Sequence, residues 1–166
     1  MAHAVLIEEL SRQESLDLLA RTRLGRLACT RGSQPYVVPV YFAYADRSLY
    51  GFATVGKKIE WMRANPLVCV EVDEVVSPQQ WASVIVSGRY EELPDTSAWR
   101  SARAFAHRLL KQSGVWWEPA YVKTILGGAP RPLVPVFYRI HIEETSGHRA
   151  SPEAPAPAAT RGRRRP

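Results

Sequence analysis

The sequence predicts a mainly β protein of the α+β class, an antiparallel barrel with helices around it. About six segments have the composition or the alternating hydrophobicity of strands, and most are joined by short turns. Helical segments stand near both ends and in two connections, without the regular strand–helix alternation of a doubly wound parallel sheet. The 166 residues, 46% of them hydrophobic, suit a single domain with one core.

Each element has its own local signal. Ser11 and Glu14 fit a capping box, so we expect a first helix from there to about residue 21. A second, short helix opens after Gly56 and closes at residues 65–66, and a third of about fifteen residues begins at 95–96. Pro39 cannot donate to a ladder, so its strand is expected at an edge or a bulge. The predicted strands cover residues 24–30, 35–44, 48–54, 66–75, 81–93 and 133–144.

Lys57 and Lys58 occupy the first turn of the short helix, where the helix dipole already places partial positive charge. At an ordinary helix start each lysine would cost a few tenths to about 1 kcal/mol. Gly56 permits a tight turn and Thr54 offers a hydroxyl donor. Amides, dipole and ammonium groups together can cap a phosphate, although spacing alone leaves a solvated surface as the alternative. The pattern lacks the G-x-x-x-x-G-K-[ST] loop, which argues against an NTPase.

Composition narrows the classes of partner. Half of the formal net charge of +6 lies on residues 151–166, which hold four arginines and one glutamate. We therefore expect a domain over residues 1–148 and a disordered Pro/Ala/Arg-rich tail over 149–166. The body is too weakly basic to indicate a nucleic-acid-binding face, although the tail could touch RNA or acidic lipid. No apolar run approaches the roughly 20 residues of a membrane span.

Compartment and catalytic groups are the next expectations. The N-terminal segment lacks a basic start followed by a long apolar stretch, so a secretory signal is not expected and the cytoplasm is. Cys29 and Cys69 stand in strand-like segments without a CxxC context and are expected to be buried free thiols. No Ser/His/Asp set or metal-spaced cluster stands out, so the sequence indicates no catalytic residue and no metal site.

Four motifs follow one another between about Leu6 and Leu93. They are a proline-bearing second strand, a short helix led by basic residues and ended by N-P, a V-x-V strand, and a strand ending in G-R-x-E. In this order they resemble the pyridoxamine 5′-phosphate oxidase-like superfamily, above all its small flavin-nucleotide-binding and nitroimidazole-resistance-like proteins. The resemblance implies a six-stranded split β-barrel that forms a homodimer with FMN at the interface.

The resemblance also implies a set of cofactor-binding residues. They comprise basic residues that would hold the phosphate, a strand whose backbone would face the isoalloxazine ring, and a loop that would meet the ribityl phosphate. In this order they are Lys57 and Lys58; Pro39, Val40 and Tyr41; and Ala53 and Thr54. Ser83 stands where the oxidase has a polar side chain that reaches the cofactor. Trp81 would pack nearby, across the dimer, with a core position as the alternative.

Three functions are compatible with these residues. The leading hypothesis is an FMN-dependent oxidoreductase that moves an electron pair between a reduced nicotinamide and a small unsaturated or aromatic acceptor. The second keeps the fold and uses a deazaflavin, and the third is a non-catalytic flavin or haem carrier or redox sensor. Two departures keep the reaction open. Phe52 and Ala53 replace the histidine of nitroimidazole-resistance proteins, and Arg139 and His141 lack the flanking residues of the oxidase's substrate signature.

Overall fold

The computed structural model describes residues 4–117, 123–132 and 134–153. Its helices are α1 (Arg12–Arg21), α2 (Lys57–Ala64), α3 (Arg100–Gln112) and the single 3₁₀ turn η1 (Ser97–Trp99). Its strands are β1 (Val5–Glu9), β2 (Leu24–Arg31), β3 (Gln34–Tyr41), β4 (Ala43–Ala45), β5 (Ser48–Ala53), β6 (Leu67–Ser77), β7 (Gln80–Leu93), β8 (Lys123–Leu126), β9 (Ala129–Pro132) and β10 (Val136–Pro152). The mainly antiparallel class with helices around the sheet is therefore confirmed.

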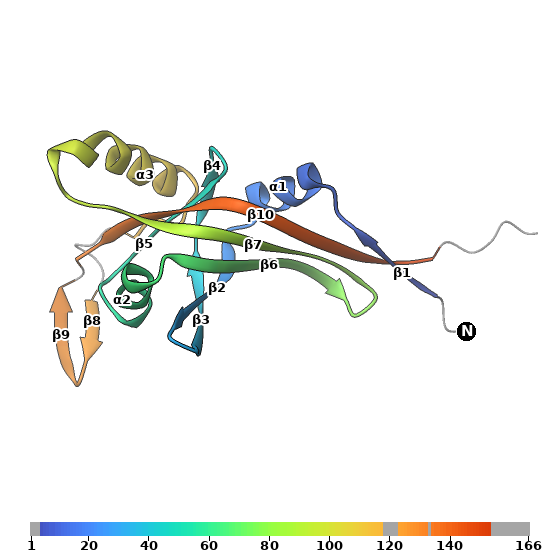
Figure 1. Cartoon of the computed structure of the whole chain (residues 1–166), viewed down its shortest axis with the longest axis horizontal. Coiled ribbons are helices and arrows are strands. Elements are labelled where there is room, and N and C mark those ends of the chain that lie inside the picture. Colours follow the sequence, from blue (N-terminus) through green and yellow to red (C-terminus); the bar gives the residue numbers. More distant parts are fainter. Residues whose placement is uncertain (1–3, 118–122, 133, 154–166) are drawn as a thin grey trace, which may run out of the picture.

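Eight strands make one antiparallel sheet in the order β3-β2-β6-β7-β10-β5-β4, with β1 added to β10. Its two end strands, β3 and β4, are consecutive parts of one segment that is interrupted at Phe42. The sheet curls without closing, which is the split-barrel form of the predicted fold. Figure 1 shows β6, β7 and β10 running lengthwise, with β1 at one end and α2 and α3 toward the other.

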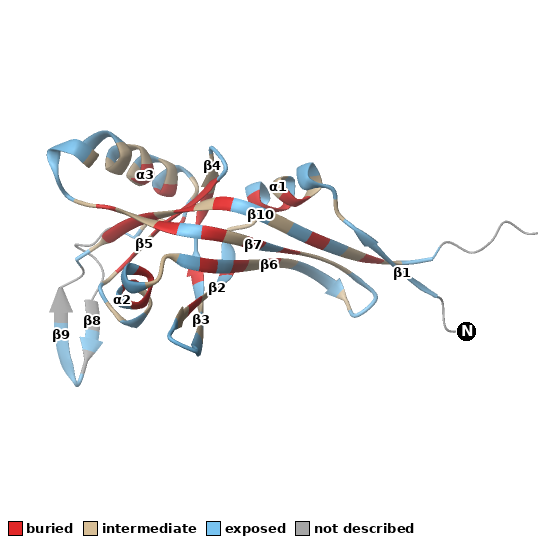
Figure 2. Ribbon diagram, in the orientation of Figure 1, coloured by how far each residue is buried: buried red, intermediate tan, exposed pale blue. Residues whose placement is uncertain are grey.

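The two faces of the sheet carry separate cores, because successive side chains of a strand point to opposite faces. Leu49, Tyr138 and Ile140 lie in the larger core inside the barrel, together with apolar residues of α1 and α2. Their sequence neighbours Tyr50 and Phe137 lie in the smaller core, which α3 covers from outside. Figure 2 shows this alternation as bands of buried residues along the long strands.

The predicted helices form where their sequence signals stand. Ser11 Oγ accepts from the Glu14 amide at 3.2 Å, and the Glu14 carboxylate accepts from the Ser11 amide at 2.7 Å, which confirms the capping box. Helix α2 begins after Gly56 and ends before Asn65, as predicted. The third helix is confirmed with a later start, because η1 takes the first turn after residue 96.

The final strand is longer than its pattern predicts. The sequence indicated an end at residue 144, but β10 continues to Pro152, past the expected domain boundary at residue 148. A bulge between Ile142 and Glu144 breaks the alternation there, and ladders to β7 and β1 hold the remainder extended. The rest of the predicted tail, residues 154–166, lies outside the described residues.

Other local expectations were incomplete. Strand β1 was not predicted, because its only partner is the distant end of β10. The segment expected as a loop or short helix after α3 includes the hairpin β8–β9, whose turn at Gly127 and Gly128 has φ values of 59° and 77°. Cys29 is a buried free thiol as predicted, but the prediction was wrong for Cys69, which points outward from β6 and is exposed. No helix in the described ranges is long and apolar enough to span a membrane.

Candidate functional site

The sheet opens where β3 gives way to β4. Ala43 on β4 pairs with Tyr50 on β5, whereas β3 pairs with β2. In the described part of the chain no ladder joins β3 to β5, so the two strands separate from this point. We call the unpaired region between β3 and the end of β5 the split.

The predicted ring strand and the predicted phosphate loop lie on opposite sides of the split. Val40 on β3 and Ala53 on β5 are buried in the same interior core. Pro39 and Tyr41 point to the outer face of the sheet and are exposed. Thr54 is half-buried and leads directly into the turn before α2. The fold thus gathers these five predicted residues around one opening.

Helix α2 begins at the split without a side-chain cap. Gly56 is its N-cap residue, in extended backbone with φ −172°, and its carbonyl accepts the Glu60 amide at 3.0 Å. A Cβ at Gly56 would meet only the Thr54 carbonyl oxygen, at 4.0 Å, so the space beside it is open. The first-turn amides of a helix need a partner from outside the helix. At α2 that partner can be water or a bound anion.

The two lysines at this start are held differently. The Lys57 ammonium lies 4.6 Å from the centroid of the Tyr36 ring and 4.8 Å from that of the Trp61 ring. Lys58 is half-buried, and this burial lowers the pKa of its ammonium although the Cys29 thiol opposes the shift. Among the residues that the structure describes, neither lysine pairs with a carboxylate. Two cations therefore share an uncapped helix start, and the described chain supplies no anion to either.

Three residues beside the lysines were missed by sequence reasoning. Cys29 is buried inside the barrel opposite Tyr36, and burial raises the pKa of its thiol while Lys57 and Lys58 oppose the shift. Trp61 follows Lys57 by four residues, so both lie on one face of α2, and this spacing was a usable signal. Tyr36 gave no such signal, because the fold of β3 alone brings it to the helix.

Trp81 and Ser83 lie far from the lysines within one chain. The end of α2 leads into the Leu67–Arg89 pair of the β6–β7 ladder. Trp81 stands eight residues from Arg89 along β7, roughly 26 Å at about 3.3 Å per residue. The structure thus does not bring Trp81 and Ser83 to the split of their own chain.

An aromatic cluster spans the outer side of the split. The Trp117 ring lies 6.3 Å from Tyr41 on β3 and 6.0 Å from Phe52 on β5, centroid to centroid. Trp116 lies 4.7 Å from Phe52 and stacks on Phe137 at 5.5 Å. Trp117 and Tyr41 remain 54% and 50% exposed. The segment after α3 therefore contacts both strands that border the split and leaves two aromatic rings open there.

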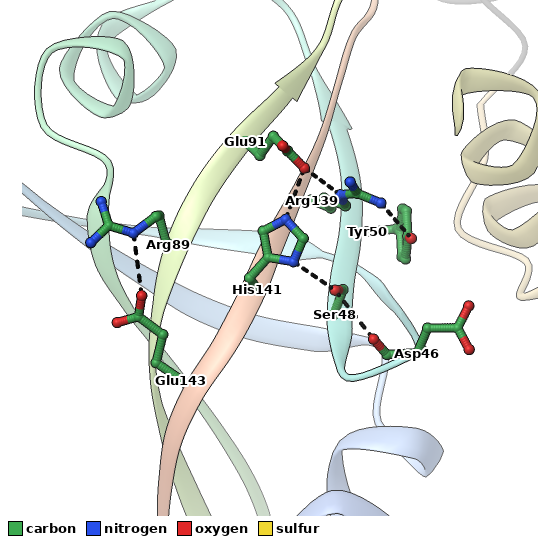
Figure 3. A network of polar contacts seen from close by, with 8 residues as sticks. All are labelled: Asp46, Ser48, Tyr50, Arg89, Glu91, Arg139, His141 and Glu143. Atoms are coloured by element: carbon green, nitrogen blue, oxygen red, sulfur yellow. Dashed lines mark hydrogen bonds and ion pairs between the residues drawn. The ribbon is translucent and has the colours of Figure 1, made fainter. Parts of the chain in front are cut away.

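A polar network occupies the outer face of β5, β7 and β10, with Arg139 and His141 both directed at Glu91, as Figure 3 shows. His141 Nε2 lies 2.8 Å from the Glu91 carboxylate, and its Nδ1 lies 3.4 Å from Ser48 Oγ. Burial opposes ionisation of Glu91, but hydrogen bonds from His141 and Arg139 hold the pKa of its carboxyl below the usual value. Arg139 and His141 share a face as predicted, and Glu91 already compensates the arginine charge.

A shallow groove of about 330 Å³ lies on the outer face between β2, β6 and β7. Its floor is mostly apolar, with Glu143 at one side, paired to Arg89 at 3.2 Å. Within the described ranges no group of three or more His, Cys, Asp or Glu side chains could hold a metal ion. The lysine-led start of α2 is thus the described feature that most directly calls for a ligand. The side chains that line the groove are Ala28, Thr30, Leu67, Cys69, Ser87 and Glu143.

Comparisons with known proteins agree with this geometry. The sequence model of the pyridoxamine 5′-phosphate oxidase family matches residues 11–149. The crystal structure of a FAD-binding protein from Mesorhizobium loti is 46% identical, covers 89% of this chain and 99% of its own, and superposes with a TM-score of 0.71. A protein of Rhizobium meliloti strain 1021 is 38% identical over 146 residues, 88% of this chain and 97% of its own. The fold is shared by the FAD-binding protein of Mycobacterium smegmatis, at 23% identity over 85% and 98% of the two chains, with a TM-score of 0.60.

Proposed function

The chain belongs to the pyridoxamine 5′-phosphate oxidase family, and from that premise we propose that it is an FMN-dependent oxidoreductase that works as a homodimer. It would exchange an electron pair between a reduced nicotinamide and a small unsaturated or aromatic acceptor. The observation that carries the proposal is the start of α2, where two ammonium groups and free helix amides lack an anion from the described residues. A flavin phosphate would supply that anion.

The residues at the split fit such a cofactor. Lys57, Lys58 and the α2 amides would hold the phosphate, and the Thr54 hydroxyl would donate to it. The half-buried Lys58 is well suited, because an ion in a partly dry site gains more from a counter-ion than one in water. FMN supplies the hydride and electron chemistry when bound, while the protein binds, orients and shields it.

The ring end of the flavin has partners on the other side of the split. The backbone of Pro39, Val40 and Tyr41 on β3 would face the edge of the ring, and Ala53 would lie beneath the chain that links ring and phosphate. Strand β3 is an end strand that pairs on one side with β2. Backbone groups on its other side are therefore available to hydrogen-bond a ligand.

A second copy of the chain would complete the site. The outer face of β2, β3, β6 and β7 exposes several large apolar side chains, which a monomer seldom leaves in contact with water. Because alternate residues of β7 share a face, Trp81 and Ser83 lie on the same side of the sheet as Ile85. A partner docked on this face could bring its own Trp81 and Ser83 to the split. The exposed apolar residues of this face are Leu24, Val37, Leu67 and Ile85.

The experiment is a cofactor titration of the purified protein by flavin fluorescence, with FMN, FAD, riboflavin and a deazaflavin nucleotide. We expect FMN to bind and riboflavin, which lacks the phosphate, to bind at least tenfold more weakly. A protein that co-purifies with no flavin and gains none on incubation would contradict the proposal. Preference for FAD or for the deazaflavin would replace FMN while keeping the phosphate site.

Turnover separates an enzyme from a carrier. The FMN-loaded protein is mixed anaerobically with NADH or NADPH, and loss of the oxidised flavin absorbance is followed. Reduction by either donor, followed by reoxidation with a small quinone or nitroaromatic acceptor, is the expected result. Tight FMN binding with no reduction by either donor would instead favour a carrier or a redox sensor. Sedimentation analysis of the same sample tests the dimer.

A further inference from the structure

Two aromatic rings hold the Lys57 ammonium in place. Its Nζ lies 4.6 Å from the Tyr36 centroid and 4.8 Å from the Trp61 centroid, and the rings are 5.7 Å apart and inclined by 60°. Both distances are within the range of about 6 Å over which a ring face attracts a cation. The two rings form an open corner, which we call the aromatic corner, and the ammonium sits in its mouth.

The aromatic corner is fixed by elements other than the lysine itself. Trp61 is 8% exposed and belongs to the interior core. Tyr36 is half-buried, packs against the same core and lies opposite Cys29 in the β2–β3 ladder. Movement of either ring would disturb the barrel interior or the ladder. The rings therefore define where the ammonium rests.

An ammonium held by ring faces keeps its hydrogen-bonding capacity. It has three N–H donors, and ring faces attract its charge without taking the conventional acceptor sites that a carboxylate would offer. Lys57 remains an exposed residue, so the side of the ammonium away from the rings is open. A lysine side chain loses much rotamer freedom when it binds an anion. The aromatic corner removes part of that freedom before the anion arrives.

We propose that Tyr36 and Trp61 are positioning residues for the phosphate of the cofactor. They act through Lys57: the rings hold its ammonium beside the uncapped start of α2, and the protein thereby prefers phosphorylated to unphosphorylated flavin. Lys58 needs no such support, because burial of its stem already restricts it. This inference rests on the proposed function. It adds two residues to the site and states which property of the ligand they select.

The test compares the ratio of riboflavin Kd to FMN Kd, which isolates the contribution of the phosphate, in wild type, Tyr36→Leu and Tyr36→Phe. We expect Tyr36→Leu to lower the ratio about fivefold, since a ring–cation contact contributes a factor of roughly two to ten. Tyr36→Phe keeps a ring face and should retain the wild-type ratio within about twofold. If Tyr36→Leu does not fold, Tyr36→Val, with a better strand former, takes its place.

A double-mutant cycle identifies the route. In a Lys57→Ala background the rings have no ammonium to position, so Tyr36→Leu should change the ratio by less than about twofold. A ratio unchanged by Tyr36→Leu alone, or lowered equally in both backgrounds, would overturn the inference while leaving the proposed function intact. A higher ratio would also overturn it, since the rings would then keep Lys57 away from the phosphate. A wild-type protein that binds neither flavin would overturn the proposed function and this inference with it.

Discussion

Helices α1 and α2 begin under opposite electrostatic conditions. At α1 the side chains of Ser11 and Glu14 satisfy the first amides, and Arg149 pairs with Glu14 at 2.8 Å. At α2 the N-cap is Gly56, no side chain caps it, and the first two helical residues are lysines. One start is complete within the described chain, whereas the other adds positive charge to the positive end of the helix.

The difference teaches where stability ends and function begins. A helix start that only supports the fold satisfies its own amides, as α1 does. A start that contradicts its dipole persists when something else makes it useful, and such local conflicts concentrate at functional sites. Four predictions break or sharpen this comparison, in decreasing order of expected effect.

The largest effect is expected from removal of both cations at α2. The double variant Lys57→Ala/Lys58→Ala should weaken FMN binding by more than about tenfold, because hydrogen bonds to charged groups contribute roughly 1.5–3 kcal/mol each. Fluorescence titration with FMN measures it. The control Arg100→Ala/Lys111→Ala removes two exposed cations of α3 instead and should leave the Kd within about twofold. An unchanged Kd in the lysine variant would sink the phosphate assignment.

Giving α2 the kind of cap that α1 has should remove its ligand site. The extended φ and open space at Gly56 accept a side chain, so Gly56→Asp can cap the first-turn amides and repel a phosphate. We expect FMN affinity to fall about tenfold while the apoprotein gains a few tenths of a kcal/mol in unfolding free energy. Titration and urea unfolding measure the two effects. Gly56→Ala, which adds a methyl group without a cap, should bind FMN within about twofold of wild type.

Removal of the α1 cap should affect stability alone. Ser11→Ala is expected to lower the free energy of unfolding by about 1 kcal/mol, the usual effect of losing an N-cap side chain. Urea unfolding measures this change, and FMN titration should show no change in Kd. Ser101→Ala, at an exposed position within α3, is the matched serine control and should not destabilise the protein. A weaker Kd in Ser11→Ala would mean that the two helix starts are coupled.

The smallest effect is a pH dependence of the apoprotein. Burial lowers the pKa of Lys58 below its ordinary value of 10.5, so the unfolded chain binds more protons than the folded one in that interval. The unfolding free energy should therefore rise with pH between the folded pKa and 10.5. The wild type is compared with Lys58→Met by urea unfolding, in a Cys29→Ala background that removes the neighbouring thiol. Saturating FMN should flatten the rise, since a phosphate favours the charged lysine. A rise that persists in Lys58→Met would assign it to another group.

Sequence reasoning was most successful where the signals are local. The capping box at Ser11 and the short helix after Gly56 depend on neighbouring residues, and both are confirmed. Pro39 was expected at an edge or a bulge, and β3 stands at the end of the sheet's path. The opposing charges at α2 were visible in the sequence, although only a resemblance to a family connected them to a flavin.

The remainder depends on contacts between distant residues. Strand β1 pairs with residues 148–152, a partner that no local pattern could indicate. The contact of Tyr36 with Lys57 requires β3 to fold back against α2. Trp81 was placed near the cofactor by family position, yet the length of β7 separates it from the lysines of its own chain. Its role in the site stays a prediction that depends on a second copy.

The position of β10 in the sheet has a consequence for the order in which the protein folds. It is the last strand of the sheet in sequence, but it lies between β7 and β5. Without it, β3-β2-β6-β7 and β5-β4 are two separate ladders joined only through the chain, and β1 has no partner. Pairings so distant in sequence form slowly. A ribosome must therefore release β10 before the barrel can assemble, and the start of α2 acquires its ligand-binding form only after translation of the whole sheet.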